Sequence, residues 1–229
     1  MNILTFDTCF AACSAAVGVG MSTAHEKIIS RFEPMQTGHA ERLIAMVGEV
    51  MTEAGIVFAD LNRIGVTIGP GSFVGTRVGV SAARAFSLAS GAPVISVTSL
   101  AAMARKAALI LRPATDICVV VDVRHDEVYA QVFDQTGLIA RTVPQLLALH
   151  AAAEVGLLQP LVYVGTAAER VVGLIPNQSV TAELLTLLPD ASDLIVPVSQ
   201  SGQSMSPATP LYLRPPDAKP PMAAALQRR

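Results

Sequence analysis

Short apolar runs separated by turn residues open the chain and predict three strands. Residues 2–8 (NILTFDT) and 13–20 (CSAAVGVG) are apolar and β-prone, and the turn-like segment CFAA separates them. Residues 24–32 (AHEKIISRF) have the composition of a further strand. Runs of this length between turn signals are typical of strands. The N-terminal part is therefore expected to begin with a hairpin and a third strand.

A helical period starts at His39. Apolar residues recur at positions 43, 44, 46, 47, 50, 51 and 54, and Gly55 follows them. This spacing predicts a helix over 39–54 that ends on a C-cap glycine. The apolar positions cover well over half of the helix circumference, whereas a helix buried on one side needs a narrower stripe. The excess suggests a second covered surface.

The next apolar run, 64–71 (IGVTIGPG), predicts a strand that leads into a Gly-Pro-Gly turn. A helix is expected over 73–91 and a buried strand over 92–98. The glycines fit neither phosphate signature, because no Lys follows them and Val74 stands where G-x-G-x-x-G needs its third glycine. The turn could still present free N–H groups to a phosphate at the start of the helix.

Small residues recur every four positions along the second helix, at Gly75, Gly79, Ala83, Ser87 and Gly91. Residues at this interval share one helix face, so the helix has a ridge without bulk. Glycine inside a helix costs about 1 kcal/mol relative to alanine, which indicates that bulk there would obstruct something. Two interpretations remain open: close packing on the chain's own sheet, or contact with a helix of another chain.

Under the second interpretation, the helices 39–54 and 75–90 form one side of a four-helix contact. The candidate interface residues are then His39, Leu43, Met46, Val47, Val50, Gly75, Gly79, Ala83 and Ser87.

A later passage repeats the opening pattern. Residues 117–137 read as strand, turn and strand, with Asp122 at the place that Asp7 has in the first hairpin. The repeat predicts two lobes of related topology. Beyond it, 144–156 and 179–188 look helical, 161–165 and 194–198 look like strands, and the Pro- and Ser-rich stretch 201–222 looks extended or loosely ordered.

Composition narrows the functional classes. Apolar residues make up 52% of the 229 residues, yet charged residues or Pro interrupt every run before the roughly 18 residues of a membrane span. The surplus fits an Ala-rich core or a surface hidden against another protein. With a net charge of −2 and no basic block longer than QRR, unaided nucleic-acid binding is not expected. Three cysteines without paired spacing indicate no disulfide framework or zinc site, and the absence of a signal-peptide pattern predicts a cytoplasmic protein.

Few residues are candidates for chemistry. The four histidines show no metal-binding spacing, and His39 is expected to cap its helix or lie at the surface. The group Asp122, His125 and Asp126 reads as an acid/base cluster or as a polar turn. Ser72 is no nucleophile elbow, because Pro70 stands where that motif needs glycine. Asp7 and Thr8 end the first strand, where a carboxylate could organise Mg²⁺ and nucleotide phosphates or simply form a turn. No catalytic or metal-binding constellation is predicted.

Several long stretches carry a resemblance to a known family. They are 3–8 with 13–17, 39–55, 119–133, the closing PLYLR at 210–214 and, above all, 69–100 (GPGSFVGTRVGVSAARAFSLASGAPVISVTSL). On these residues the chain resembles the TsaB (YeaZ) family of tRNA threonylcarbamoyladenosine biosynthesis. The likeness runs through about the first 135 residues and returns near 212, while 136–205 match weakly. The pair His125-Asp126 before EVY is a mild departure from the family pattern.

The resemblance implies an α/β, two-lobed actin-like ATPase (sugar kinase/Hsp70/actin, ASKHA) fold. We expect an N-terminal lobe over 1–100 with the interface helices, a smaller second lobe over 101–210, and a tail over 211–229 that returns to the first lobe. The implied partners are the TsaD paralogue in a heterodimer and the ATPase TsaE, with a homodimer when the chain is alone. Transfer RNA is reached only through the complex, which adds threonylcarbamoyl to N6 of adenosine 37 in tRNAs reading ANN codons.

The resemblance also implies that this chain is a non-catalytic scaffold. The paralogue holds its metal through an H-x-x-x-H pair, and the matching positions here are Ser99 and Met103, which do not replace imidazole. ATP and metal are therefore expected in the partner subunits. Asp7, Thr8, Gly69 and Gly71 remain candidates for a vestigial nucleotide site. The alternative is a small ATP-binding enzyme of the same fold that uses Asp7 and Asp122.

Overall fold

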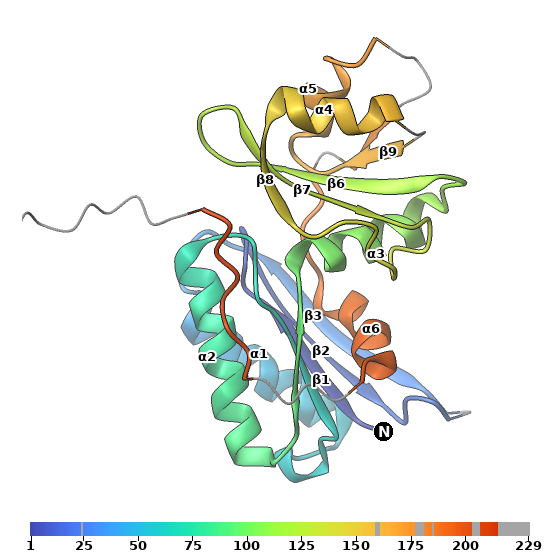
Figure 1. Ribbon diagram of the computed structural model, residues 1–229. Coiled ribbons are helices and arrows are strands. Elements are labelled where there is room, and N and C mark those ends of the chain that lie inside the picture. The colour runs from blue at the N-terminus through green and yellow to red at the C-terminus, as the bar shows by residue number, and fades with distance from the viewer. Residues whose placement is uncertain (24, 159–160, 177–180, 185, 203–206, 215–229) are drawn as a thin grey trace, which may run out of the picture.

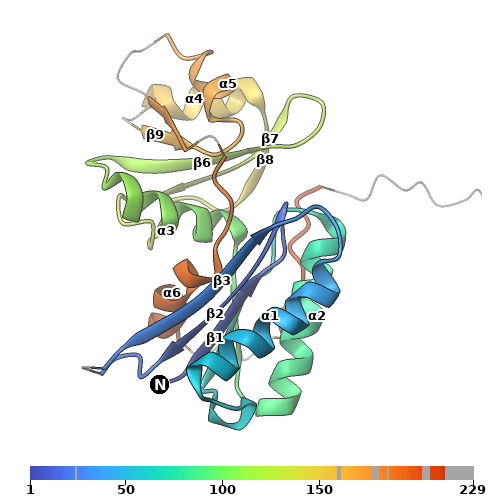
Figure 2. The same ribbon diagram turned by 180° about the vertical axis from the view of Figure 1, so that it is seen from behind.

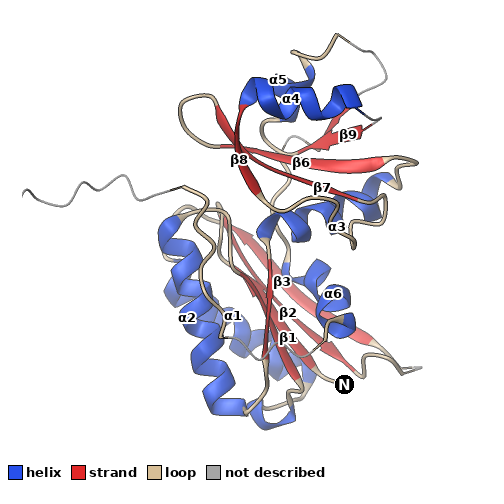
Figure 3. Cartoon of the chain, viewed as in Figure 1, coloured by secondary structure: helices blue, strands red, loops and turns tan. Residues whose placement is uncertain are grey.

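The computed structural model describes residues 1–23, 25–158, 161–176, 181–184, 186–202 and 207–214. Two five-stranded sheets lie one above the other, with helices outside and between them (Figure 1, Figure 3). No helix in these ranges is long and apolar enough to cross a membrane.

The first sheet contains the predicted N-terminal strands. Its strands are β1 (Ile3–Asp7), β2 (Ala12–Val19), β3 (Lys27–Pro34), β4 (Arg63–Thr67) and β5 (Val94–Val97). Their order is β3-β2-β1-β4-β5. The pairs β1–β2 and β2–β3 are antiparallel, whereas β4 pairs in parallel with both β1 and β5. The predictions of a hairpin, a third strand and two later strands are confirmed.

The second sheet repeats this topology. Its strands are β6 (Asp116–Asp122), β7 (Glu127–Phe133), β8 (Gln145–Ala148), β9 (Leu161–Val164) and β10 (Thr181–Glu183). Their order, β8-β7-β6-β9-β10, again places an antiparallel meander beside two parallel strands. Asp7 and Asp122 each end the central strand of their sheet. The prediction of two lobes with related topology is confirmed.

Helices cover the outer faces of both sheets. The helices α1 (His39–Ala54) and α2 (Phe73–Ser90) pack on the first sheet, and the short η1 (Phe58–Asp60) follows α1. The helices α4 (Leu149–Leu158) and α5 (Ala168–Val172) pack on the second sheet. Figure 2 shows α1 and α2 side by side on the first lobe. As predicted, α1 spans 39–54 and ends on Gly55, whose φ of 69° is left-handed.

Short and medium-length helices form the layer between the two sheets. Helix α3 (Ser99–Leu111) follows the first sheet in sequence, but its buried side chains pack with those of β6 and β7. The segments η2 (Ala191–Leu194) and α6 (Ile195–Gln200) follow the second sheet, but they pack with Ile3 and Ala16 of the first. Residues 191–200, which we assigned to the second lobe, therefore complete the core of the first.

Several predictions after residue 100 are wrong. Residues 145–148 and 181–183 fall in segments predicted to be helical, yet they form β8 and β10, because β7 and β9 offer free edges to pair with. Residues 194–198, predicted as a strand, lie in η2 and α6, where Ile195 and Val198 bury one helical face. No element was predicted for 99–111, the residues of α3.

The described part of the C-terminal segment lies along α2. The Leu211 N–H donates to the Ile68 carbonyl at 2.7 Å, and the Arg84 guanidinium donates to the Ala208 carbonyl at 2.6 and 2.9 Å. Residues 207–214 contain neither helix nor strand. The predictions for 203–206 and 215–229 lie outside the described residues.

Candidate docking face

One face of α1 is used by the chain itself. The side chains of Leu43, Met46, Val47 and Val50 are at most 1% exposed and pack against the first sheet. The prediction that Met46, Val47 and Val50 contact another chain is therefore wrong, whereas Leu43 also lines the groove described below. They form the stripe that any amphipathic helix turns toward its own sheet.

The small-residue ridge of α2 also faces inward. A Cβ on Gly75 would lie 1.9 Å from the Thr8 carbonyl oxygen, and one on Gly79 would lie 2.8 Å from Thr8 Oγ1. Gly75, Gly79 and Ala83 are buried. Of the two interpretations left open, close packing on the chain's own sheet is correct, and these three residues are not an interface with another chain.

The two remaining interface candidates are half-buried and hold local structure. The His39 ring nitrogen Nε2 lies 2.9 Å from the Phe10 carbonyl oxygen, which ties the start of α1 to the β1–β2 turn. The Ser87 hydroxyl donates to the Ala92 carbonyl at 2.7 Å and fastens the end of α2.

The outward faces of α1 and α2 enclose an apolar groove of about 560 Å³. Its lining consists of Ala40, Leu43, Ile44, Val74, Arg77, Val78, Ser81, Ala82 and Ala85. Ile44 is 56% exposed and Val74 is 68% exposed, and the two side chains lie together at this groove. We call this groove and its rim the docking face.

Part of the docking face was visible in the sequence. Ile44 is one of the apolar positions that cover more of the first helix than a single buried face needs. Its side chain is exposed, so part of this apolar surface does face away from the chain's own core. Positions 74, 78, 82 and 85 of α2 form a helical stripe beside the glycine ridge, and this stripe was not predicted although its spacing is regular. Spacing alone did not show which of the two stripes faces the sheet.

The four nucleotide-site candidates come together in a packed junction. Asp7 is fully buried, and its Oδ1 accepts hydrogen bonds from the Thr67 hydroxyl and the Cys9 N–H. Its Oδ2 has no hydrogen-bond partner among the described residues. Burial raises the pKa of Asp7 to about 6, against the lowering effect of the Thr67 hydroxyl. Thr8 is 1% exposed and donates to the Gly75 carbonyl at 2.7 Å.

The Gly-Pro-Gly turn is closed by the chain's own backbone. Ser99 donates to the Gly69 carbonyl through its N–H at 2.9 Å and to the Pro70 carbonyl through its hydroxyl at 2.5 Å. The Cys9 carbonyl oxygen lies 2.4 Å from where a Cβ on Gly71 would be. A magnesium–nucleotide complex needs a carboxylate that it can reach, and Asp7 is enclosed, so this junction does not fit such a ligand.

The positions that the resemblance aligns with metal-binding histidines lie inside the protein. Ser99 is 0% exposed, and Met103 is 1% exposed in the core between α3 and the second sheet. Neither position fits a metal ligand. In the part of the chain that the structure describes, no group of three or more His, Cys, Asp and Glu side chains could hold a metal ion.

The turn between β6 and β7 is a polar turn. Arg170 forms ion pairs with Asp122, at 2.7 Å, and with Asp126. His125 and Asp126 have φ values of 60° and 57°, as in a tight hairpin turn. Because the carboxylates are neutralised by Arg170 and the Asp126 side chain is 81% exposed, the turn interpretation is favoured over an acid/base cluster.

The repeated sheet order and the helices between the sheets define a two-lobed α/β protein of the actin-like ATPase (ASKHA) class. A family model described as "TsaD: tRNA N6-adenosine threonylcarbamoyltransferase" matches residues 32–167, more than half of the chain. Together with the relatives given next, this match shows that the chain belongs to the TsaB (YeaZ) family.

TsaB of Escherichia coli K12, described as a tRNA threonylcarbamoyladenosine biosynthesis protein, is 35% identical over 60% of this chain. The match spans 58% of that protein's own length. An uncharacterised protein of Mycobacterium tuberculosis is 33% identical over 96% of this chain and 94% of its own. The structure of YeaZ from Pseudomonas aeruginosa superposes with a TM-score of 0.79 at 27% identity, covering 93% of this chain and 99% of that one.

Proposed function

We propose that this chain is a non-catalytic subunit in the transfer of threonylcarbamoyl to N6 of adenosine 37 in tRNAs reading ANN codons. It binds a TsaD-type paralogue through the docking face and works together with TsaE. When the paralogue is missing, a second copy of the chain occupies the same face. The chain acts in the cytoplasm and reaches tRNA only through the complex.

The biosynthetic role is supported by the relatives. The relatives from E. coli and Haemophilus influenzae are both described as tRNA threonylcarbamoyladenosine biosynthesis protein TsaB. A stretch of 62 residues is 47% identical to a tRNA N6-adenosine threonylcarbamoyltransferase of Erythrobacter litoralis, although it spans only 18% of that protein. This local likeness to a transferase supports a TsaD-type paralogue as the partner.

The scaffold role is supported by what the interior residues do. The two positions that would need imidazole carry Ser99 and Met103, and both are committed to packing. Asp7 is enclosed beside Thr67 and Cys9. The alternative of a small ATP-binding enzyme has no supporting geometry among the residues described here.

The docking face is the observation that carries the proposal. Half-exposed Ile44 and Val74 border a groove whose lining is largely Ala, Val, Leu and Ile. Apolar side chains gathered along two neighbouring helices are a feature of protein contact sites. A stable contact there would need to bury about 1,000 Å² or more. The helices α1 and α2, of 16 and 18 residues, are long enough for such a contact.

Reconstitution tests the proposal. The formation of modified tRNA is measured with TsaD, TsaE and threonylcarbamoyl-adenylate, with and without this chain. We expect modification only when the chain is present and no ATP turnover by the isolated chain. ATP turnover by the isolated chain that is lost in Asp7→Ala would favour the enzyme alternative instead.

A further inference from the structure

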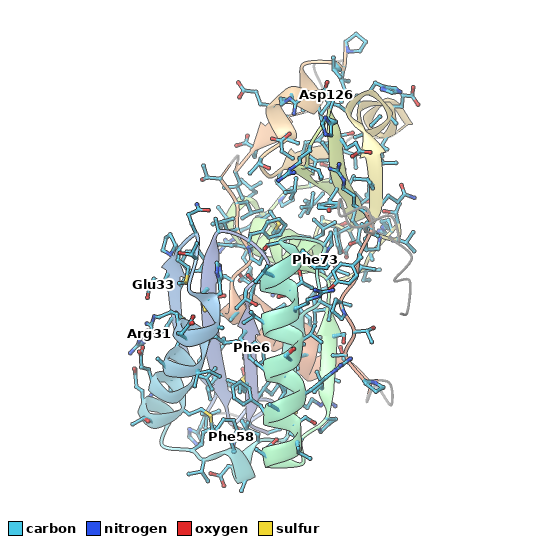
Figure 4. All side chains as sticks on the ribbon, turned by 90° about the vertical axis from the view of Figure 1, so that its left-hand side faces the viewer. Phe6, Arg31, Glu33, Phe58, Phe73 and Asp126 are labelled. Atoms are coloured by element: carbon cyan, nitrogen blue, oxygen red, sulfur yellow. The ribbon has the colours of Figure 1, made fainter. Side chains whose placement is uncertain are left out.

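One end of the docking face carries a cation beside two aromatic rings that contact each other. The guanidinium carbon of Arg77 lies 3.6 Å from the centroid of the Phe73 ring and 5.7 Å from that of Tyr212. The two ring centroids are 5.1 Å apart, and Arg77 Nε donates to the Tyr212 hydroxyl at 2.8 Å. Figure 4 shows Phe73 at the end of α2 that lies toward the second lobe. We call Phe73, Arg77 and Tyr212 the arginine clamp.

The C-terminal segment builds half of this clamp. Tyr212 follows Leu211, whose N–H bonds to Ile68, and the same segment is fixed to α2 through Arg84 and the Ala208 carbonyl. These anchors hold the Tyr212 ring beside α2, 135 residues away in sequence from Arg77. The segment 207–214 therefore borders the docking face at Arg77.

Arg77 is held but its charge is not neutralised. Its Nε is taken by Tyr212, and its two terminal nitrogens have no partner among the described residues. Stacking on Phe73 and the Nε bond to Tyr212 restrict the orientation of the guanidinium. A fixed guanidinium matches a carboxylate with two parallel hydrogen bonds.

Arg77 also lines the groove, next to Val74 and Val78. A partner seated there would remove the guanidinium from water, which is unfavourable unless the charge is paired. A nucleic acid would not use the apolar lining, whereas a protein helix would. The apolar groove with one cation at its end thus fits an amphipathic helix that carries a carboxylate beside its apolar stripe.

We propose that Arg77 binds a carboxylate of the partner helix that occupies the groove, and that Tyr212 is a positioning residue for Arg77. This inference rests on the proposed docking of a TsaD-type paralogue and names the chemistry of its contact. The ion pair between Arg77 and the carboxylate sets how the partner's helices align along α1 and α2. Apolar contacts alone would allow the partner helix to slide along the groove by one turn.

The dissociation constant of the complex with TsaD tests the proposal. Arg77→Met keeps the apolar stem and removes the charge, and we expect a dissociation constant at least tenfold higher at low salt. The matched control is Arg112→Met, an exposed arginine of the second lobe, which should leave it unchanged. Increasing the salt concentration should weaken wild-type binding more steeply than Arg77→Met binding. Tyr212→Phe keeps the ring, removes the Nε partner and should weaken binding by a smaller factor.

The outcomes separate this inference from the docking proposal. If Val74→Asp abolishes binding while Arg77→Met binds like the wild type, the carboxylate contact is refuted and the docking face stands. If neither variant changes the dissociation constant, the docking face itself is refuted. Unchanged protein binding with weaker tRNA binding by the Arg77→Met complex would assign Arg77 to a phosphate instead. Restored binding of Arg77→Glu by one Asp or Glu to Lys change in the paralogue would identify the carboxylate.

Discussion

Gly75 is the position where the fold allows no side chain. The Thr8 carbonyl oxygen occupies the space that a Cβ would need, at 1.9 Å, and backbone cannot yield as a flexible side chain can. Gly48, on the exposed side of α1, has nothing within 4 Å of the same position. Gly75 is therefore required by the close approach of the backbone, whereas Gly48 has room for a side chain.

We predict that Gly75→Ala lowers the free energy of unfolding by more than about 2 kcal/mol, because the main chain of β1 or α2 must move. Gly48→Ala should raise it by up to about 1 kcal/mol, through helix propensity. Urea unfolding followed by circular dichroism measures both. Equal effects of the two substitutions would contradict the close approach of α2 to Thr8.

Asp7 gives the stability a particular pH dependence. Its folded-state pKa is raised to about 6 by burial, above the ordinary 3.8, so between these values the folded state binds more protons than the unfolded state. The contribution of Asp7 to stability is therefore full at low pH and is lost as the pH rises toward 6.

Asp7→Asn should remove this loss. Relative to the wild type, the variant should gain up to about 3 kcal/mol in unfolding free energy between pH 4 and pH 7, on top of any constant cost of the new amide. Urea titrations at several pH values measure the difference. A difference that does not vary with pH would show that Asp7 is not titrating in this range.

At the scale of elements, α1 has two apolar faces with different roles. One face packs on the first sheet and the other borders the groove. Met46 is 0% exposed against the first sheet, whereas Ile44 is 56% exposed beside the groove. A charge at Met46 would be taken out of water, and a charge at Ile44 would not.

Met46→Asp should therefore unfold the protein or lower its stability by more than about 3 kcal/mol. Ile44→Asp should change stability by about 1 kcal/mol or less, yet weaken binding to TsaD by more than about tenfold. Thermal melting and a binding assay on the same preparations provide the comparison. Normal binding by Ile44→Asp, or unfolding of both variants, would contradict this division of faces.

The sequence determined local elements better than their orientation. The 3.6-residue period and Gly55 placed α1 correctly, and short apolar runs between turn residues placed the first five strands. Glycine spacing showed that something approaches α2 closely, but it could not say whether Thr8 or another chain does. β8 and β10 are strands because of their neighbours in the sheet, and the contact of Arg77 with Tyr212 joins distant segments. Local pattern carries no information about such pairs.

At the scale of the molecule, the lobes complete each other. Ala102 of α3 packs in the same cluster as Ile3 of β1 and Ile195 of α6, and α3 also covers the second sheet. Arg63 of β4 donates to three carbonyls at the end of α6, those of Val198, Ser199 and Ser201. The inner face of the first sheet is therefore covered by η2 and α6, which follow the second sheet in sequence.

We therefore predict one cooperative unfolding transition. Amides of β4 and β6 should show the same opening free energy in native-state hydrogen exchange, because losing either lobe exposes the shared helices. A fragment of residues 1–98 should fail to fold. Two separate transitions, or a folded fragment, would show that the lobes are independent.

The central claim is that this chain contributes a surface and not a reactive group. Reconstituted tRNA modification with surface variants tests it most directly. Val74→Asp and Val143→Asp place the same charge at two valines that are each 68% exposed, but only Val74 lines the groove. We predict that Val74→Asp abolishes modification, whereas Val143→Asp and Asp7→Asn retain it. Full modification with Val74→Asp, or its loss with Asp7→Asn in a folded protein, would contradict the account.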